Sequence, residues 1–158
     1  MARLVIRDFE MDDFLGINKL MDEVHKLHID NRPDIYKKTA VVMSKEDFTN
    51  SLSNDKTISI VAEIDSIIVG LCIISIRDRI DNKALVSRKV AFVDNLCVLK
   101  DYRKQGIGKR LFNEGKKRAL EFSVDSLELM VWEFNKKAIN FYKSENMNTR
   151  SRIMELKL

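Results

Sequence analysis

The segment from residue 94 to residue 112, DNLCVLKDYRKQGIGKRLF, constrains the fold more than any other part of the chain. It begins with apolar residues typical of a strand, continues into a basic turn that contains Gly106 and Gly108, and ends as the start of an amphipathic helix. Glycines let the backbone approach a ligand closely, and the first N–H groups of a helix have no partner inside it. The segment therefore predicts a strand, turn and helix that bind an anion.

Two well-known phosphate-binding motifs do not fit this turn. A P-loop requires Gly-x-x-x-x-Gly-Lys-Ser/Thr, whereas the glycines here are separated by one residue and Lys109 is followed by arginine. A dinucleotide fingerprint requires a third glycine at the position of Leu111. The remaining pattern is Arg-x-x-Gly-x-Gly, formed by Arg103, Gly106 and Gly108. Taken alone, this pattern is equally compatible with a solvated basic helix start.

The positive charge of the chain is concentrated around the same turn. The whole chain has a net charge of +4, whereas residues 100–118, with eight basic and two acidic residues, carry +6. Tyr102 is the only aromatic residue of the basic turn, and the rest of the chain is close to neutral. Binding of nucleic acid is therefore disfavoured, because an extended basic surface with several aromatic residues is absent.

The composition describes one globular domain over residues 1–158. The longest apolar run, residues 67–74, is too short for a membrane span, and the N-terminus lacks the apolar core of a signal peptide. Cys72 and Cys97 lie within apolar segments, which indicates reduced thiols and a cytoplasmic location. No group of His, Cys, Asp and Glu has the spacing of metal ligands, so we expect no metal.

The periodicity of apolar residues predicts strands and helices along the whole chain. The predicted strands are 2–9, 57–64, 67–77, 87–99, 125–133 and 150–158. The predicted helices are 12–28, 44–52, 106–122 and 135–146. Strands that first follow one another and then alternate with helices predict an α/β domain with a mixed, mostly antiparallel sheet and helices on its faces.

The strand, turn and helix resemble motif A of the GNAT N-acetyltransferase superfamily, with Val98, the Arg103–Gly108 pattern, and Lys100 in place of the usual proline. The segment NKKAINFY, residues 135–142, is similar to the Asn-x-x-Ala-x-x-Phe-Tyr motif of the same superfamily. Together the two segments look most like the diamine and polyamine branch, the spermidine/spermine acetyltransferases. The resemblance implies the GNAT fold, with six to seven strands and about four helices. It also implies transfer of an acetyl group from acetyl-coenzyme A to a primary amine.

The resemblance further implies which residues hold the cofactor. The pyrophosphate of coenzyme A would lie on the N–H groups of about residues 105–109, assisted by the basic side chains of the turn. The pantetheine arm would pair with the strand before the turn, whose edge is available because, in the family, a bulge separates this strand from the next one. Cys97 is expected to contribute its backbone and not a nucleophile, and Asn135 to cap its helix as well as contact the cofactor. The implied cofactor-binding residues are Leu96, Cys97, Val98, Arg103, Lys104, Gln105, Gly106, Ile107, Gly108, Lys109, Asn135 and Tyr142.

Acetyl transfer to an alkyl amine requires a proton acceptor and a proton donor, because such an amine (pKa near ~10.4) is mostly protonated at neutral pH. Tyr142 matches the family's donor to the thiolate, with a core aromatic as the alternative. Asp94 is the predicted base, since alternation places it in an apolar row with Phe92 and Leu96, where polyamine-type members carry Glu. Its short side chain favours a water relay. An Asp bound to a neighbouring backbone or cation is the alternative, and Glu133 is the second candidate for the base.

The acceptor side is indicated by the loop of residues 29–38 and the two histidines before it, His25 and His28. In the family this region forms part of the acceptor pocket. Asp30 and Asp34 are candidates to receive a cationic amine, and a solvated loop is the alternative. The sequence does not assign a role to either histidine.

Several functions stay open at this point. A small diamine or polyamine is the first expectation for the acceptor, and a protein N-terminus, a protein lysine, an amino acid and an aminoglycoside are alternatives. A coenzyme A-sensing module without turnover is an alternative outside enzymes, and Tyr142 argues against it. Trp132 is expected in the core and not in a cage around the acceptor. GNAT proteins are often dimers, and the closing strand 150–158 is the expected contact if this chain forms a homodimer.

Overall fold

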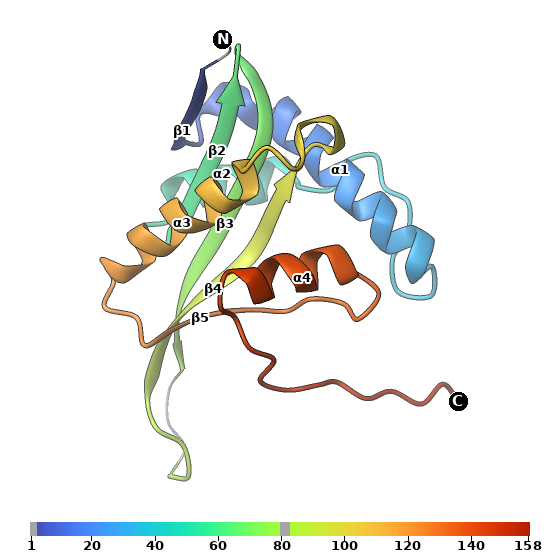
Figure 1. The fold of residues 1–158 in the computed structure, drawn as a ribbon, viewed down its shortest axis with the longest axis vertical. Helices are drawn as coiled ribbons and strands as arrows, with labels where there is room; N and C mark the ends of the chain where they lie inside the picture. Colours follow the sequence, from blue (N-terminus) through green and yellow to red (C-terminus); the bar gives the residue numbers. More distant parts are fainter. Residues whose placement is uncertain (1–2, 80–82) are drawn as a thin grey trace.

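The computed structural model describes residues 3–79 and 83–158. One sheet has the strand order β1 (Leu4–Asp8), β2 (Thr57–Ile64), β3 (Ile67–Arg79), β4 (Arg88–Val98) and β5 (Ser126–Leu129) (Figure 1). The helices are η1 (Met11–Asp13), α1 (Phe14–Asn31), α2 (Lys45–Ser53), η2 (Lys100–Tyr102), α3 (Ile107–Leu120) and α4 (Lys136–Ser144). Neighbouring strands are antiparallel except β4 and β5, which are parallel. The α/β class and the mixed, mostly antiparallel sheet are therefore confirmed.

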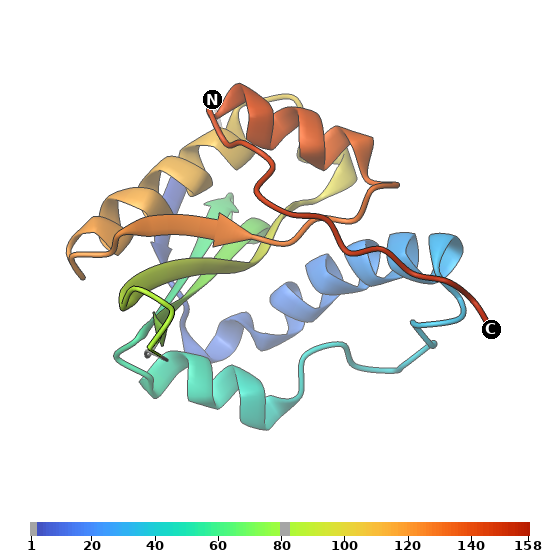
Figure 2. The same ribbon diagram turned by 90° about the horizontal axis from the view of Figure 1, so that it is seen from below.

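Helices cover both faces of the sheet. Figure 2 shows α3 and α4 on one side and α1 and α2 on the other. Helix α3 lies very close to the sheet because Gly115 has no side chain: a Cβ at this position would lie 2.7 Å from Cδ1 of Ile74. This close packing of α3 on β3 fixes where the helix lies and so helps to position the turn that joins β4 to it.

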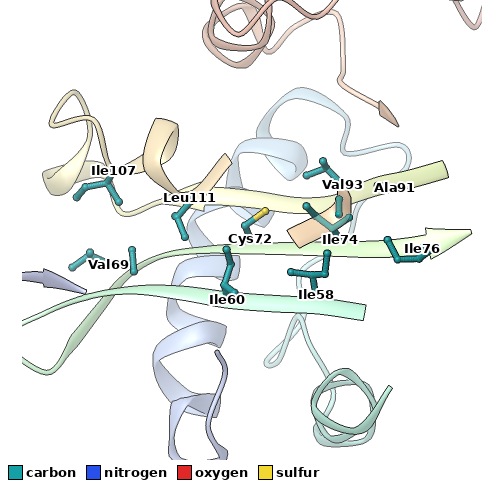
Figure 3. Packing of buried hydrophobic residues seen from close by; sticks show 12 residues of the cluster. Ile58, Ile60, Val69, Cys72, Ile74, Ile76, Ala91, Val93, Ile107 and Leu111 are labelled. Carbon is teal, nitrogen blue, oxygen red and sulfur yellow. The ribbon is translucent and has the colours of Figure 1, made fainter. Parts of the chain in front are cut away.

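The larger core lies between the sheet and α3, and Figure 3 shows it from close by. Its buried members are Ile58, Ile60, Ala62, Val69, Cys72, Ile74, Ile76, Ala91, Val93, Ile107, Leu111 and Ala119. Those from β2, and Cys72, Ile74 and Ile76 of β3, follow the period-two alternation of a sheet with one face turned to a helix, whereas Val69 lies at a shift in the β2–β3 register. Each fully buried aliphatic side chain contributes about 1.5–3 kcal/mol, so this layer holds α3 and the central strands as one unit.

The second core lies between the other face of the sheet and helices α1 and α2. Phe48 of α2 lies at its centre, with its ring 6.0 Å from that of Phe9 and 5.3 Å from that of Phe14. Helix α2 begins where predicted, because the Oγ of Ser44 accepts a hydrogen bond from the N–H of Asp47 at 3.0 Å. This core supports β3 and β4 from the side opposite α3.

A partly buried ion pair joins the first strand to the start of α1. Both oxygens of Asp13 accept hydrogen bonds from Arg7, at 2.7 and 2.9 Å, and Arg7 also contacts Glu63 on β2 at 2.6 Å. Burial by itself would raise the pKa of Asp13, but the hydrogen bonds from Arg7 and from the N–H of Glu10 outweigh it and lower that pKa. The carboxylate is therefore charged in the folded protein and ties β1, β2 and η1 together.

The predicted closing strand 150–158 is wrong, and so is the expected number of six to seven strands. The described residues form five strands, and residues 150–158 run as an exposed tail without sheet partners. The β5 strand is also shorter than the predicted 125–133. An extended segment forms a strand only where a neighbour supplies ladder hydrogen bonds, and the tail contacts the domain through side-chain ion pairs instead. Ala2, part of the predicted first strand, lies outside the described residues.

We predict that Asp13→Asn lowers the free energy of unfolding at pH 7 by about 2–4 kcal/mol, because it leaves Arg7 without its main partner. A carboxyl whose folded pKa is lowered stabilises the fold above its unfolded pKa of about 3.9, and this contribution disappears as the pH falls through the folded value. The difference between wild type and variant should therefore shrink from pH 7 towards about pH 3 in urea unfolding. A difference that stays constant with pH would contradict the assigned pKa direction.

Candidate active site

Strand β4 separates from β5 halfway along its length, and the separation begins at a β-bulge. Pairing with β5 extends only from Val90 to Val93. The ladder to β3 pairs Val93 with Ile74 and Asn95 with Ile73, which makes Asp94 the extra residue of the bulge. Beyond the bulge, β4 keeps its partners on β3 but has none on the side of β5 in the described chain. Every second N–H and C=O there points to an open edge that a ligand with amide groups can pair with.

The turn between β4 and α3 presents a row of free backbone donors. None of the six N–H groups of residues 104–109 donates a hydrogen bond to a described residue. Three of them, at Ile107, Gly108 and Lys109, are the first N–H groups of α3 and have no partner inside the helix. Gly106 shapes the turn with φ of 79°, and a Cβ there would meet no atom within 4 Å. Consecutive donors at a helix start beside open space form an anion-binding concavity.

The polar side chains of this turn have different roles. Nε of Arg103 donates to the last carbonyl of β4 at 2.8 Å, and its guanidinium lies 3.3 Å from Glu23 of α1. Arg103 therefore holds the turn against β4 and α1. Gln105 donates to a backbone carbonyl of η2 at 3.4 Å. Lys104 is exposed, and Lys109 makes one ion pair of 3.7 Å with a glutamate after α4, so both amines remain within reach of an anion at the turn.

The open edge of β4 contains Leu96, Cys97 and Val98, which the sequence analysis placed in the predicted strand 87–99. The side chains of Leu96 and Val98 pack on the α3 side, whereas that of Cys97 packs with the core under α1. Burial raises the pKa of the Cys97 thiol to about 12. The thiol is therefore protonated at neutral pH and unsuited to nucleophilic attack. Only the backbone of Cys97 is available to a ligand at the open edge.

Helix α4 starts beside the other side of the split. The Oδ1 of Asn135 accepts a hydrogen bond from the N–H of Ala138 at 3.2 Å, which confirms the predicted N-cap. The ring of Phe141 packs edge-on against Phe112 of α3, with centroids 6.0 Å apart. Capping and packing together hold α4 next to the start of α3, where the free N–H groups lie.

Tyr142 is the residue of α4 that lies at the split. Its ring centroid is 6.3 Å from that of Phe112. Burial raises the pKa of Tyr142 well above its usual range, and the neighbouring thiols of Cys72 and Cys97 act in the same direction. The hydroxyl has no hydrogen-bond partner within the described chain, in which every fully buried side-chain oxygen or nitrogen has one. Tyr142 thus presents a protonated hydroxyl that solvent, or a ligand, can reach.

Asp94 does not lie where the predicted alternation places it. Period two puts it in one row with Phe92 and Leu96, but the bulge shifts the alternation by one residue, so Val93 before it and Leu96 after it both pack on the α3 side. The prediction of an apolar row around Asp94 is therefore wrong. Its carboxylate accepts a hydrogen bond of 2.5 Å from Arg77 on β3. This contact corresponds to the second interpretation of Asp94 from the sequence, an aspartate bound to a neighbouring cation.

Arg77 is a residue that the sequence did not single out. Its guanidinium lies over the ring of Phe92 with Cζ 3.8 Å from the centroid, and its Nε donates to Oγ of Ser75 at 2.9 Å. With Asp94 as a third partner, the side chain is held from three directions. The residue belongs to a charged strand end, Arg-Asp-Arg, and its backbone pairs with Val90. Only its side-chain hydrogen bond shows that it reaches Asp94 at the bulge.

The loop after α1 and the segment before α4 meet in an aromatic cluster. Nε1 of Trp132 donates to the hydroxyl of Tyr36 at 2.9 Å, and the ring of Trp132 stacks on Phe134 with centroids 5.8 Å apart. His28 stacks on Tyr36 at 4.8 Å, and Arg32 lies 5.1 Å above Trp132. Trp132 is half-buried and belongs to neither core, so its expected place in the core is wrong. No local pattern pairs residues so far apart in sequence.

The other predicted carboxylates are paired or exposed. Asp34 binds Arg32 at 2.7 Å, and this hydrogen bond lowers the pKa of Asp34 to about 2. Asp30 is exposed on α1. Glu133 is exposed as well and lies 3.4 Å from Lys136. None of the three carboxylates is enclosed in a pocket that would isolate an amine from water.

The two histidines fix the loop after α1. Nε2 of His25 lies 2.7 Å from the carbonyl oxygen of Lys37. Burial lowers the pKa of His28, and repulsion by His25 adds to it, so the imidazole of His28 is neutral at neutral pH. Across residues 3–79 and 83–158, no three side chains of His, Cys, Asp or Glu lie close enough to hold a metal ion. No helix in those ranges is long and apolar enough to cross a membrane.

The chain matches the model of the acetyltransferase (GNAT) family over residues 21–146. It is similar to a mutant of the BH1408 protein from Bacillus halodurans, with a TM-score of 0.94 and 26% identity over 98% of this chain and 99% of that one. An aminoglycoside N-acetyltransferase in complex with coenzyme A has a TM-score of 0.77 at 17% identity, covering 100% and 96% of the two chains. At this identity the likeness shows the fold.

A curated relative shares a shorter stretch. An uncharacterized N-acetyltransferase from Lactobacillus delbrueckii subsp. lactis is 34% identical over 55 residues. The match covers 35% of this chain and 32% of that relative, so the chain spans about a third of the length of the curated relative it matches. The family match, in contrast, includes β4, the free donors at 104–109, and α4.

We predict that Gly106→Ala weakens the binding of coenzyme A about tenfold in titration calorimetry. Alanine disfavours the left-handed conformation by about 1–2 kcal/mol, so the turn shifts and its donors lose their common direction. Pantetheine, which lacks the pyrophosphate, should lose little affinity. Ser123→Ala alters another left-handed position, with φ of 56° after α3, and should leave both affinities unchanged. Equal weakening of coenzyme A and pantetheine by Gly106→Ala would contradict a pyrophosphate site at the turn.

Proposed function

The chain belongs to the acetyltransferase (GNAT) family, and we propose that it transfers the acetyl group of acetyl-coenzyme A directly to a primary amine. The observation that carries the proposal is the edge of β4 that is open among the described residues and leads into six N–H groups, at residues 104–109, that have no partner there either. Coenzyme A has the matching order of groups, since its pantetheine arm carries amides and continues into a pyrophosphate. Amides pair with a strand edge, and a pyrophosphate binds at the start of a helix.

The proposed binding residues follow from this match. The backbone of residues 96–98 pairs with the pantetheine arm, and the N–H groups of residues 104–109 hold the pyrophosphate. Lys104 and Lys109 add positive charge at the turn, whereas Arg103 acts indirectly by holding the turn against β4. Asn135 caps α4 and so keeps that helix beside the cofactor.

Acetyl-coenzyme A supplies an activated thioester, and the chain has to move two protons. A C–N bond forms while the C–S bond breaks, so the amine loses a proton and the sulfur gains one. Tyr142 is the proposed donor to the sulfur, because its phenol is protonated and its hydroxyl has no other partner in the described chain. Asp94 is the proposed acceptor of the amine proton, through a water molecule, because it lies where β4 opens. Glu133, exposed and further from the bulge in sequence, is the second candidate.

The proposed acceptor is a small primary amine. The sequence favours a diamine or polyamine, but the arginine beside Asp94 disfavours a polycation there. Two structures of similar fold, at 16–17% identity, are aminoglycoside acetyltransferases, and aminoglycosides are also polycations. A protein N-terminus or a protein lysine is an alternative acceptor. A non-catalytic coenzyme A sensor is the alternative outside enzymes, and the free hydroxyl of Tyr142 at the split favours turnover.

Thioester consumption with acetyl-coenzyme A against a panel of amines tests the proposal. The panel includes polyamines, amino acids, aminoglycosides and short peptides with a free N-terminus. We expect coenzyme A release that depends on at least one amine, with an acetylated product of the matching mass. Tight binding of acetyl-coenzyme A without turnover of any amine would support a non-catalytic coenzyme A sensor and contradict the proposed acetyltransferase activity.

We predict that Tyr142→Phe lowers kcat about a hundredfold while the KM for acetyl-coenzyme A changes little, because a general acid contributes in the chemical step and not in binding. Tyr102→Phe is a matched control, since Tyr102 lies in η2 and its side chain packs against the two cores. It should retain wild-type kinetics. Equal losses of cofactor affinity and kcat in Tyr142→Phe would identify Tyr142 as a structural residue.

We also propose that the chain forms a homodimer through the tail of residues 150–158. The tail exposes four large apolar side chains, Ile153, Met154, Leu156 and Leu158, each more than 80% exposed. A second copy would cover them. Light scattering should give twice the mass of one chain, and Met154→Lys with Leu156→Lys should return the mass to that of one chain. A monomeric wild type contradicts the dimer and leaves the proposed activity unaffected.

A further inference from the structure

The sheet face opposite α3 is rich in arginine. Arg77 and Arg79 of β3 alternate with Ile74 and Ile76, which pack under α3, so the two arginines extend from the other face. Arg88 of β4 is the cross-strand partner of Arg79 and belongs to the same face. This face adjoins the bulge where β4 opens, and it contains the side chains that an amine would meet beside Asp94.

The carboxylate of Glu128 forms ion pairs with several arginines at the same time. It lies 3.3 Å from Arg79, 2.6 Å from Arg88 and 2.5 Å from Arg150 of the tail, and Ser126 donates to it at 3.1 Å. Burial by itself would raise the pKa of Glu128, but the hydrogen bonds from Arg88 and Ser126, with the charge of Arg150, lower it. Even with Glu128 fully charged, one carboxylate faces three guanidinium groups.

Arg77 forms the second part of the same surface. Glu128 is the cross-strand neighbour of Phe92, and the guanidinium of Arg77 lies over Phe92, so Arg77 and the Glu128 cluster are adjacent. With Asp94 included, four arginines face two carboxylates, so these six side chains together carry a net charge of +2. A site built for a diamine or polyamine would have the opposite balance.

The guanidinium of Arg77 is held in place and still has donors to offer. Two of its five N–H groups bind Ser75 and Asp94, and the other three have no partner among the described residues. Its side chain is 42% exposed. A planar guanidinium fixed by stacking, with free donors, is suited to bind a carboxylate or phosphate through two hydrogen bonds.

We propose that the acceptor is an amine that also carries an anionic group, a carboxylate or a phosphate, and that Arg77 binds this group while the amino group lies beside Asp94. The inference rests on the proposed acetyltransferase function and names its substrate class. Arg77 and Asp94 form a fixed pair of opposite charges, which is complementary to a molecule that carries both charges itself. An acceptor with an ammonium group in place of the anion would bring that group against the arginines, and this repulsion disfavours polycations without an anionic group.

Steady-state acetylation of matched amines tests the proposal. Each pair differs in the anionic group: ornithine and putrescine, lysine and cadaverine, phosphoethanolamine and ethanolamine. We expect wild type to favour the anion-bearing member at least tenfold in kcat/KM, the size of one charge-assisted interaction. The amino acid pairs and the phosphate pair distinguish a carboxylate site from a phosphate site, because only the matching chemistry should show the full preference.

Variants of Arg77 show whether this residue carries the preference. Arg77→Gln removes the charge and should bring the ratio within each pair close to one, and Arg77→Lys, which keeps the charge without the planar donors, should retain part of it. Because the ratio compares two amines in the same variant, a general loss of activity cancels. Lys56→Gln is the matched control, since it also removes an exposed cation from an ion pair, with Asp78 at 3.0 Å. Its ratio should equal that of wild type.

The outcomes separate this inference from the proposed function. Turnover of amines with a wild-type ratio of one or less overturns the inference and leaves the acetyltransferase in place. A preference for anion-bearing amines that Arg77→Gln does not change overturns the role of Arg77. If no amine of either kind is acetylated by protein that binds acetyl-coenzyme A, the proposed function fails, and the substrate class fails with it.

Discussion

The β-bulge at Asp94 is the feature on which the rest of the site depends. Without the extra residue, β4 would continue beside β5, and ladder hydrogen bonds would close the edge of residues 95–98. With it, the edge opens before the turn whose N–H groups at 104–109 donate to no residue in the described part of the chain. The bulge also brings the carboxylate of Asp94 to Arg77 on the opposite face. One inserted residue thus produces an amide-pairing edge on one side and a charged pair on the other.

The two cores keep this opening in a fixed shape. Helix α3 packs closely on the sheet at Gly115, and α1 and α2 pack against the other face and support β3 and β4. On the outer side of the split, Glu128 of β5 is tied to arginines of β3, β4 and the tail. The strands on both sides of the opening are therefore braced by packing and by ion pairs, and a ligand can bind without the sheet having to open further. This arrangement is what direct transfer between two bound molecules requires.

The features that the sequence predicted well are local ones. The turn at 104–109 follows from glycines, basic residues and a helix start within one short segment, and the Asn135 cap follows from its place before α4. Asp94 was misplaced because period two holds only in a strand without a bulge. The family resemblance implied a bulge in this strand, but no residue pattern places it at Asp94. The closing strand failed because an apolar, extended segment still needs a neighbouring strand. The contacts of Arg77 and the Trp132–Tyr36 hydrogen bond depend on register and tertiary packing, which the sequence does not contain locally.

The central claim is that the open edge of β4 and the donors of residues 104–109 hold one molecule of coenzyme A. Amide resonances in a ¹H–¹⁵N spectrum report on these groups directly during a titration with coenzyme A. The account predicts large shifts and slower hydrogen exchange for the amides of residues 104–109 together with alternate amides of residues 95–98. Binding of coenzyme A that leaves the amides of residues 104–109 unshifted would contradict it.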